Sequence, residues 1–232
     1  MDEVRAKIAV FGSGSELAAA LCDELASRKI EVVRVSSRSL YADETLDYGE
    51  PREYSELTKS FFAKHPNITG VVIFCGKRFF RNTEDLDDLG WIASLQANLI
   101  IPSIIAANAI KLFKERGGGS LLFMSSIWAV KTGLYRAPYG IGKVGIEKLV
   151  KQIAREQGKF NIKANAICPG VIDTISTREA VGDQMDELKS KIPLGCFGKP
   201  SDIAVISADL LLERHPFLTG QSIVVDGGFV LD

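Results

Sequence analysis

The chain has 232 residues, of which 46% are apolar, so it can bury a substantial hydrophobic core and fold without disulfides or bound metals. Its 28 basic and 29 acidic side chains give a formal net charge of −1. This balance excludes the global positive field that recruits nucleic acids or anionic membranes, so we expect neither as a partner. Any partner must be recognised at a local site.

No two of the four cysteines form a C-x-x-C motif, and only two histidines are present as further metal ligands. We therefore expect neither a disulfide framework nor a metal site. The first residues lack the pattern of a signal peptide. The longest apolar stretch, LIIPSIIAANAI, is interrupted by Pro102 and Asn108 and is too short to cross a bilayer. These features favour a cytoplasmic protein of a reducing compartment.

Short β-branched runs alternate with longer segments of helical period, which predicts βαβ units and a parallel sheet buried on both faces. The predicted strands are 6–11, 29–36, 45–48, 69–76, 119–126, 160–170 and 220–228, and the predicted helices are 15–27, 84–113, 138–158 and 201–213. The sequence contains no internal repeat or linker. It therefore predicts a single α/β domain over 1–232, with a doubly wound parallel sheet of about seven strands.

A glycine-containing turn follows the first predicted strand and opens a helix. In this context a dinucleotide pyrophosphate can sit at a helix N-terminus, so the candidate cofactor residues are Gly12, Ser13, Gly14, Ser15, Glu16 and Leu17. Glu16 stands where a third small residue is expected, and its carboxylate would repel phosphate unless it points away or caps the helix. A tight turn without a ligand stays open as the alternative.

The end of the second predicted strand, Ser36–Ser39, lacks the acidic residue that binds the ribose of NAD. It carries Arg38 beside Ser37, and a guanidinium with neighbouring hydroxyls matches a 2′-phosphate. The pattern favours NADP, with NAD as an alternative. A solvated loop arginine is the third interpretation.

Tyr139 and Lys143 are four residues apart and share one helix face. Ser126 ends the fifth predicted strand, at the carboxyl edge where open α/β sheets bind their ligands. A tyrosine with a pKa of about 10 is a poor acid or base at neutral pH, and a neighbouring ammonium lowers that pKa. The pair is thus suited to acid–base chemistry, although an ordinary contact on a half-buried helix gives the same spacing.

With their neighbours, these residues resemble the short-chain dehydrogenase/reductase family over nearly the whole chain. Tyr139-Gly-Ile-Gly-Lys143 resembles the family's Y-x-x-x-K, and Ser126 lies 13 residues before the tyrosine, where the family's serine is expected. NAICPGVIDT (165–174) resembles N-x-x-x-P-G-x-I-x-T, and 194–211 with 218–228 is similar to the family's C-terminal region. The resemblance implies a Rossmann-type fold and a homo-oligomer, tetramer or dimer. It also implies hydride transfer between NAD(P) and a small carbonyl or secondary alcohol.

The resemblance also implies roles for individual residues. Tyr139 is the acid in reduction and the base in oxidation, Lys143 lowers its pKa and holds the nicotinamide ribose, and Ser126 orients the substrate oxygen. Asn98 anchors a proton-relaying water. The further cofactor residues that it implies are Asp47 and Tyr48 at the adenine, Cys75 and Gly76 after the fourth strand, and Pro169, Gly170, Ile172 and Thr174 at the nicotinamide end.

Two segments on the cofactor side depart from the family pattern. The glycine-rich turn lacks its threonine and two later glycines, and Ile73-Phe74-Cys75-Gly76 replaces N-N-A-G. A non-catalytic dinucleotide-binding or sensing protein is therefore an alternative. A nucleotide-sugar epimerase or dehydratase shares Y-x-x-x-K but needs a longer substrate domain than we expect in this length.

Residues around the proposed site have weaker assignments. Trp128, Tyr135 and Arg136 lie between Ser126 and Tyr139 in sequence and form either a substrate wall or ordinary packing. The polar segment 176–199 is predicted to be a mobile substrate lid, because lids are segments with few buried contacts. We expect the thiols that end the fourth and sixth strands to serve mainly in packing.

Overall fold

The structure, a computed structural model, describes residues 6–47, 53–79 and 81–231. Within these ranges, seven parallel strands form one sheet in the order β3-β2-β1-β4-β5-β6-β7. The strands are β1 Lys7–Phe11, β2 Glu31–Ser36, β3 Glu44–Thr45, β4 Gly70–Ile73, β5 Gly119–Met124, β6 Ile162–Pro169 and β7 Ser222–Val225. The predicted doubly wound parallel sheet is confirmed.

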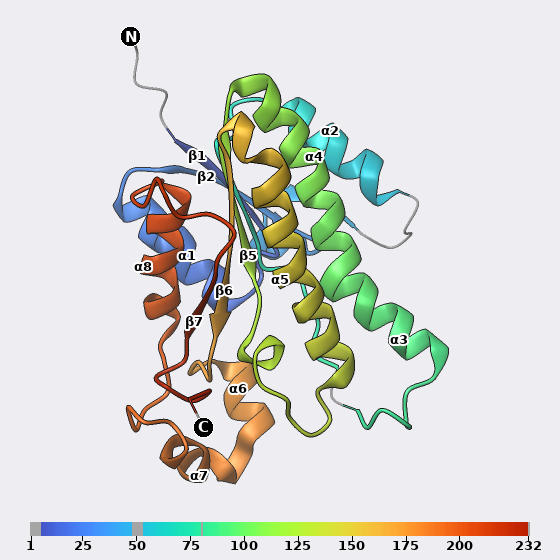
Figure 1. Ribbon diagram of the computed structural model, residues 1–232, viewed down its shortest axis with the longest axis vertical. Helices are drawn as coiled ribbons and strands as arrows, with labels where there is room; N and C mark the ends of the chain where they lie inside the picture. Colours follow the sequence, from blue (N-terminus) through green and yellow to red (C-terminus); the bar gives the residue numbers. More distant parts are fainter. Residues whose placement is uncertain (1–5, 48–52, 80, 232) are drawn as a thin grey trace.

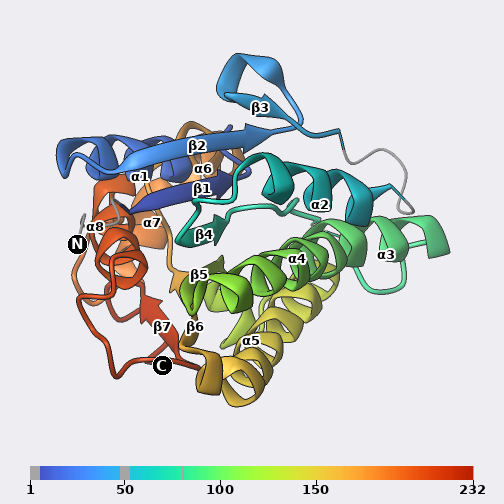
Figure 2. The same cartoon turned by 90° about the horizontal axis from the view of Figure 1, so that it is seen from above.

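Helices cover both faces of this sheet (Figures 1 and 2). α1 (Glu16–Ser27) and α8 (Pro200–Leu211) pack on one face, and α2 (Tyr54–Lys64), α4 (Ile101–Arg116) and α5 (Ala137–Gln157) pack on the other. α3 (Asp88–Leu95) precedes α4 and contacts α5. Two short helices, α6 (Ile175–Val181) and α7 (Met185–Ser190), lie beyond the lower ends of the strands in Figure 1.

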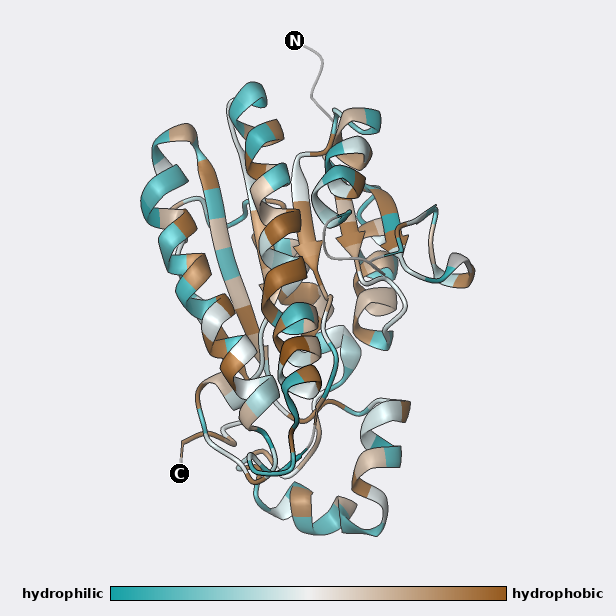
Figure 3. Cartoon of the chain, turned by 90° about the vertical axis from the view of Figure 1, so that its right-hand side faces the viewer, coloured by the Kyte–Doolittle hydropathy of each residue, from teal (hydrophilic) through white to brown (hydrophobic). Residues whose placement is uncertain are grey.

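The alternation of side chains along β1 explains the two-sided core. Ala9 and Phe11 pack into the cluster under α2, α4 and α5, whereas Ile8 and Val10 pack under α1 and α8. The Phe11 ring meets Phe61 of α2 edge to face, with 5.1 Å between ring centres. The strands are consequently apolar on both sides. Figure 3 shows brown, hydrophobic residues in the strands together with some teal, hydrophilic ones.

The strand order creates the place where a ligand can bind. β1 lies between β2 and β4, so the crossovers leaving β1 and β4 run in opposite directions along the sheet. Open α/β sheets hold their ligands in the crevice that this reversal leaves at the carboxyl ends of the strands. All the predicted site motifs follow such strand ends, with the exception of Asn98 and the Tyr139–Lys143 helix.

Asp88–Arg116 forms one continuous helical run in which a π-helical turn, Gln96–Ile100, joins α3 to α4. Its 29 residues are long and apolar enough to cross a membrane by length and composition, so the sequence expectation of no such stretch is wrong by this criterion. Pro102 does not interrupt the helix because it lies in the first turn of α4. The inner side of α4, including Ile105 and Phe113, packs into the core.

Several boundaries differ from the sequence prediction. β3 has only two residues, and Tyr48, at the end of its predicted strand, lies outside the described residues. α2 is absent from the prediction, although its buried residues Tyr54, Thr58, Phe61 and Phe62 recur at helical spacing. The other observed strands are shorter than predicted at one or both ends.

Candidate functional site

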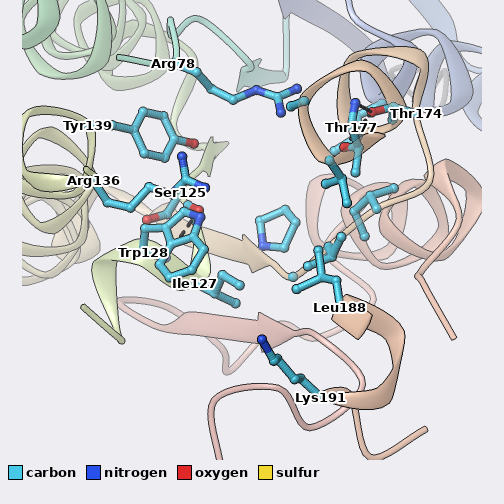
Figure 4. Close-up of a pocket in the computed structure, with 18 of the residues that line it drawn as sticks. Arg78, Ser125, Ile127, Trp128, Arg136, Tyr139, Thr174, Thr177, Leu188 and Lys191 are labelled. Carbon is cyan, nitrogen blue, oxygen red and sulfur yellow. Dashed lines mark hydrogen bonds between the residues drawn. The ribbon is translucent and has the colours of Figure 1, made fainter. Parts of the chain in front are cut away.

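A cavity of about 420 Å³ opens at the carboxyl ends of β5 and β6, between the start of α5 and the helices α6 and α7 (Figure 4). Of the predicted site residues, Leu17, Ser126, Tyr139, Pro169, Gly170, Ile172 and Thr174 line it. Trp128 and Arg136 form part of the wall, whereas Tyr135 is exposed and is not among the lining residues. Residues of the predicted lid, among them Thr177 and Leu188, close the opposite side.

Ser126 and Tyr139 meet at one end of this cavity. A side-chain hydrogen bond joins them, and the Tyr139 hydroxyl points into the cavity. Ser126 also accepts a hydrogen bond from the Trp128 N–H at 3.3 Å, which fixes its rotamer at the start of a short 3₁₀ turn. The neighbouring Ser125 hydroxyl instead donates to Glu147 at 3.4 Å. Ser126 is therefore the serine that the fold brings to the tyrosine.

Burial dominates the electrostatics of Tyr139. It raises the pKa of the phenol, and the hydrogen bond to Ser126 and the positive charges of Arg78 and Arg136 oppose that rise. The family resemblance assigned the lowering of this pKa to Lys143. In the structure the positive charges that oppose the rise are those of Arg78 and Arg136, and the role of Lys143 stays a prediction.

Lys143 is buried one turn along α5 from Tyr139. Its Nζ donates to the Met124 carbonyl at 2.9 Å and lies 5.5 Å from the centre of the Tyr139 ring. Burial lowers the pKa of Lys143 to about 8. The ammonium is thus held between the end of β5 and the tyrosine by the strand's own carbonyl.

Asn98 lies in the π-helical turn and is fully buried. Its Nδ2 donates to the carbonyls of Ser94 at 3.0 Å and Lys77 at 2.8 Å, and its Oδ1 accepts from the Lys77 N–H at 3.2 Å. A side chain at Gly76 would place Cβ 2.8 Å from Asn98 Oδ1 and 3.1 Å from Lys143 Nζ. Gly76, Asn98 and Lys143 consequently form one close-packed cluster behind Tyr139.

The turn after β1 requires one of its glycines by geometry. Gly12 has φ +80, and a Cβ there would lie 2.9 Å from the Cys75 N atom. A Cβ at Gly14 would make only ordinary contacts, the nearest at 3.5 Å to the Tyr41 ring. The Ser13 hydroxyl donates to the Tyr41 carbonyl at 2.5 Å, and Ser15 caps α1 by accepting from Ala18 N–H at 3.2 Å.

Glu16 connects two elements that are far apart in sequence. Its Oε1 accepts a hydrogen bond from the Ile175 N–H at 2.7 Å, linking the first residue of α1 to the first residue of α6. The carboxylate thus neither caps α1 nor lies buried. It bridges the glycine turn and the helix that covers the cavity.

The residues predicted to bind the adenosine part of the cofactor lie after β2 and β3. Arg38 is exposed, and its N–H donates to Ser36 Oγ at 3.3 Å. Ser37 and Asp47 are exposed as well. The Leu46 N–H donates to the Ser36 carbonyl at 3.0 Å, which brings the segment before Asp47 against the end of β2. These residues share one edge of the sheet with Gly14.

The segment after β6 is tightly constrained. A Cβ at Gly170 would lie 2.6 Å from the Asp226 Cα, so only glycine fits this approach between the ends of β6 and β7. Thr174 caps α6 by accepting from the Thr177 N–H at 3.2 Å, and Ile172 is buried and bridges to Gly198. Pro169, Gly170, Ile172 and Thr174 accordingly form a rigid rim on the cavity.

Positive side chains dominate the charge of the cavity wall. Arg78, Arg136 and Lys191 line it together with a single acidic residue, Glu187, which pairs with Lys191 at 2.7 Å. Arg78 is absent from the sequence prediction. The sequence feature that could have indicated Arg78 is its position two residues after Gly76, beyond the carboxyl end of a central strand.

Comparison with known proteins identifies the family. The chain is 29% identical to carbonyl reductase family member 4 of Xenopus tropicalis, over 96% of this chain and 97% of that protein. It is 26% identical to the oxidoreductase YmfI of Bacillus subtilis, over 89% of this chain and 82% of that protein. The family model described as enoyl-(acyl carrier protein) reductase matches residues 9–230. The chain belongs to the short-chain dehydrogenase/reductase family. It is thus an NAD(P)-dependent oxidoreductase.

The fold of this short-chain dehydrogenase/reductase agrees with solved structures. One of them is a gluconate 5-dehydrogenase from Burkholderia cenocepacia, in complex with NADP and tartrate. It superposes with a TM-score of 0.91 at 21% identity, covering 100% of this chain and 98% of that chain. At this identity the likeness concerns the Rossmann-type fold, which the sequence resemblance predicted.

The residues of this short-chain dehydrogenase/reductase fit a dinucleotide. The left-handed Gly12 lets the turn pass close to β4, and the first N–H groups of an α-helix have no intrahelical acceptors and can bind a phosphate. The two departures from the family pattern have local explanations. Cys75 packs directly against Gly12, and the Glu16 carboxylate is engaged by Ile175.

The cysteines near the site are neutral. Burial raises the pKa of Cys75 to about 12, and burial with the hydrogen bond to Glu147 raises that of Cys168 to about 12. Neither thiol is therefore a thiolate nucleophile at neutral pH. In the ranges that the structure describes, no group of three His, Cys, Asp or Glu side chains could hold a metal ion.

Proposed function

We propose that the chain interconverts a carbonyl and a secondary alcohol, with NADPH as the preferred reductant and Tyr139 as the proton donor. The observation that supports this best is the hydrogen-bonded Ser126–Tyr139 pair at the end of a closed cavity, with Lys143 buried one turn behind it. The substrate is a small molecule, since the site is a cavity within a single domain.

In reduction, NADPH supplies a hydride to the carbonyl carbon. Tyr139 donates its phenolic proton to the carbonyl oxygen, while Ser126 holds that oxygen by a hydrogen bond. Because burial raises the pKa of Tyr139, the phenol stays protonated at neutral pH, which suits the reductive direction. A proton from solvent then restores the phenol.

Lys143 and Asn98 support this proton transfer. We propose that the buried ammonium stabilises negative charge that develops on Tyr139 and also holds the nicotinamide ribose. Asn98 fixes the segment after β4 through its hydrogen bonds with the N–H and the carbonyl of Lys77, and it packs near Lys143 by way of Gly76. We propose that it anchors the water through which the proton is relayed.

The cofactor would be held by residues 12–17 at its pyrophosphate, and by Ser37 and Arg38 at the 2′-phosphate. Asp47 would lie at the adenine, with Tyr48 outside the described residues. Cys75 and Gly76 would lie near the ribose, and Pro169, Gly170, Ile172 and Thr174 near the nicotinamide. The preference for NADP rests on the exposed guanidinium of Arg38 at the end of β2.

Arg38→Ala tests this preference. It removes the partner of the 2′-phosphate, so the dissociation constant for NADPH should rise by about 10-fold or more, while that for NADH stays within about 2-fold. Titration of cofactor fluorescence measures both. Equal effects on the two cofactors would refute the assignment of Arg38 and favour the NAD-preferring alternative.

The competing function is a dinucleotide sensor without turnover, which the Glu16 carboxylate beside the cofactor turn favours. Calorimetric titration with NADPH, followed by absorbance at the nicotinamide band with a panel of ketones and aldehydes, separates the two. We expect binding and hydride transfer. Binding without transfer to any carbonyl would support the sensor, and no binding at millimolar cofactor would refute both.

We further propose a cytoplasmic homo-oligomer, a dimer or tetramer. α3 and α5 contact each other and leave large apolar side chains exposed, among them Ile92 on α3 and Ile141 and Val144 on α5. An apolar surface of this kind on neighbouring helices is typical of a subunit interface. Light scattering after size exclusion measures the oligomeric state.

A further inference from the structure

The charges around the cavity point to the substrate class, and this inference rests on the reductase function proposed above. We propose that the substrate carries an anionic oxygen group, a carboxylate or a phosphate, next to its reactive carbonyl, and that Arg78 and Arg136 bind this group. Both side chains line the cavity, and Figure 4 shows Arg136 beside the Tyr139 hydroxyl and Arg78 reaching across the cavity toward α6.

Arg78 reaches the cavity from the segment after β4. Its Nη2 donates to the Ser176 hydroxyl at 2.5 Å, which is a neutral partner from the start of α6. Within the part of the chain that the structure describes, no carboxylate lies within 4.0 Å of its guanidinium. Its charge is therefore held at the cavity by a neutral hydroxyl and is available to a ligand.

Arg136 approaches from the other side, at the start of α5. It is half-buried, with its guanidinium 5.1 Å from the centre of the Trp128 ring, so the indole fixes its direction. Burial lowers the pKa of Arg136, and the positive charge of Arg78 lowers it further. Two like charges facing one cavity disfavour each other, and an anion bound between them would reverse that repulsion.

The remaining charges of the wall do not supply this anion. Glu187 is paired with Lys191 at 2.7 Å, so the acidic and basic side chains of the lid cancel. Among the described residues that line the cavity, Arg78, Arg136 and Lys191 thus stand against one acidic side chain, Glu187. Because both also lower the pKa of Tyr139, the anionic group of the substrate lies within electrostatic reach of the hydroxyl that would meet the carbonyl.

The test compares pairs of probes in which one member carries an anionic group and the other is its neutral counterpart. Acetoacetate is compared with methyl acetoacetate, and dihydroxyacetone phosphate with dihydroxyacetone, each with saturating NADPH. Arginine–anion hydrogen bonds predict a kcat/KM about 10-fold or more higher for the charged member of at least one pair. The pair that shows the preference identifies the anion as carboxylate or phosphate.

Variants assign the preference to the two arginines. Arg78→Met and Arg136→Met should each reduce the preference for the anion to near unity, mainly through KM, and leave NADPH binding within about 2-fold. Arg155→Met is the matched control, because Arg155 is exposed in the last turn of α5, far along the helix from Arg136. It should retain the wild-type preference.

Two results would overturn the inference while leaving the proposed function intact. One is equal use of the charged and neutral probes by the wild type. The other is a loss of NADPH affinity in Arg78→Met with an unchanged preference, which would make Arg78 a cofactor residue. If no probe accepts a hydride, the binding of malonate to the NADP⁺ complex decides. Loss of malonate binding in both arginine variants supports the anion site, and equal binding contradicts it.

Discussion

Tyr139 and Lys143 lie one helical turn apart, and burial shifts their pKa values in opposite directions. It raises that of the phenol and lowers that of the ammonium to about 8. In both cases burial favours the neutral form, because the charged form loses its hydration. The cations that offset this for the tyrosine, Arg78 and Arg136, come from the segment after β4 and the start of α5, so the site depends on residues outside the Y-x-x-x-K spacing.

Lys143→Met should change how stability depends on pH. Below about pH 8 the lysine is protonated in the folded and the unfolded chain, so its burial destabilises the fold by a constant amount. Between about 8 and the ordinary value of 10.5 the unfolded chain binds more protons, and stability rises with pH. The variant lacks that rise in the free energy of unfolding, which is on the order of 3 kcal/mol in the wild type.

Denaturant unfolding of the apo wild type and variant across this pH range measures the difference. Titratable groups that do not interact with Lys143 are common to both proteins and cancel. A difference that stays flat from neutral pH to above 10.5 would show that Lys143 is not desolvated in the fold.

At the scale of elements, α1 and α6 are joined across the site by Glu16 and Ile175. This contact connects the cofactor turn to the first helix of the predicted lid, 176–199. α6 and α7 are short and mostly exposed, so few buried contacts oppose their movement. We expect cofactor binding and lid position to be coupled through this carboxylate.

Two substitutions at Glu16 separate its charge from its hydrogen bond. Glu16→Gln keeps an acceptor for the Ile175 N–H but removes the negative charge near the expected phosphates, so NADPH should bind several-fold more tightly, by about 1 kcal/mol. Glu16→Ala removes both, and should also speed amide exchange in 175–181 of the apo protein. Hydrogen exchange and cofactor titration measure these effects. Unchanged exchange in Glu16→Ala would contradict the connection between α1 and α6.

The elements differ in how far the sequence determines them. The central strands are predictable because a strand buried on both faces must be continuously apolar, as β4 and β5 are. β3 pairs over two residues only, and such a short edge has too few side chains to form a pattern. α2 was predictable from its spacing of buried residues, whereas the π-helical turn at Asn98 arises from packing against Gly142 and leaves no local signal.

The residues of the candidate site also differ in how far the sequence reveals them. Tyr139 and Lys143 were predicted from their spacing on one helix face, and Ser126 from its place at a strand end. The 165–174 segment was predicted from its resemblance to the family pattern. Arg78 could not be found by spacing, since its role depends on which strand end faces α6 after folding. The partner of Glu16 was also hidden, because Ile175 offers a backbone N–H, which every residue other than proline has.

At the scale of the whole molecule, one sheet with two apolar faces carries both the cofactor edge and the substrate cavity. The proposed cofactor residues follow β1, β2, β4 and β6, so a bound dinucleotide would contact both sides of the strand-order reversal. A ligand of this kind binds only the folded chain and stabilises it as a unit.

NADPH should accordingly raise the melting temperature. At a concentration of about 100 times its dissociation constant it adds about 2.7 kcal/mol, which for a domain of this size corresponds to about 5–10 °C. NADH at the same concentration should give a smaller shift, since it lacks the 2′-phosphate. Differential scanning fluorimetry compares the two, and a larger shift with NADH would reverse the assigned preference.

The central claim is that Tyr139 transfers the proton in a reductase reaction. The direct measurement is the single-turnover rate of NADPH oxidation with an accepted carbonyl in Tyr139→Phe, with NADPH affinity measured in parallel. Tyr135→Phe is the control, because this tyrosine is exposed and is not among the residues that line the cavity. The account predicts a loss of about 10²-fold or more in Tyr139→Phe with NADPH affinity retained, and a normal rate in the control. A near-normal rate in Tyr139→Phe would contradict it.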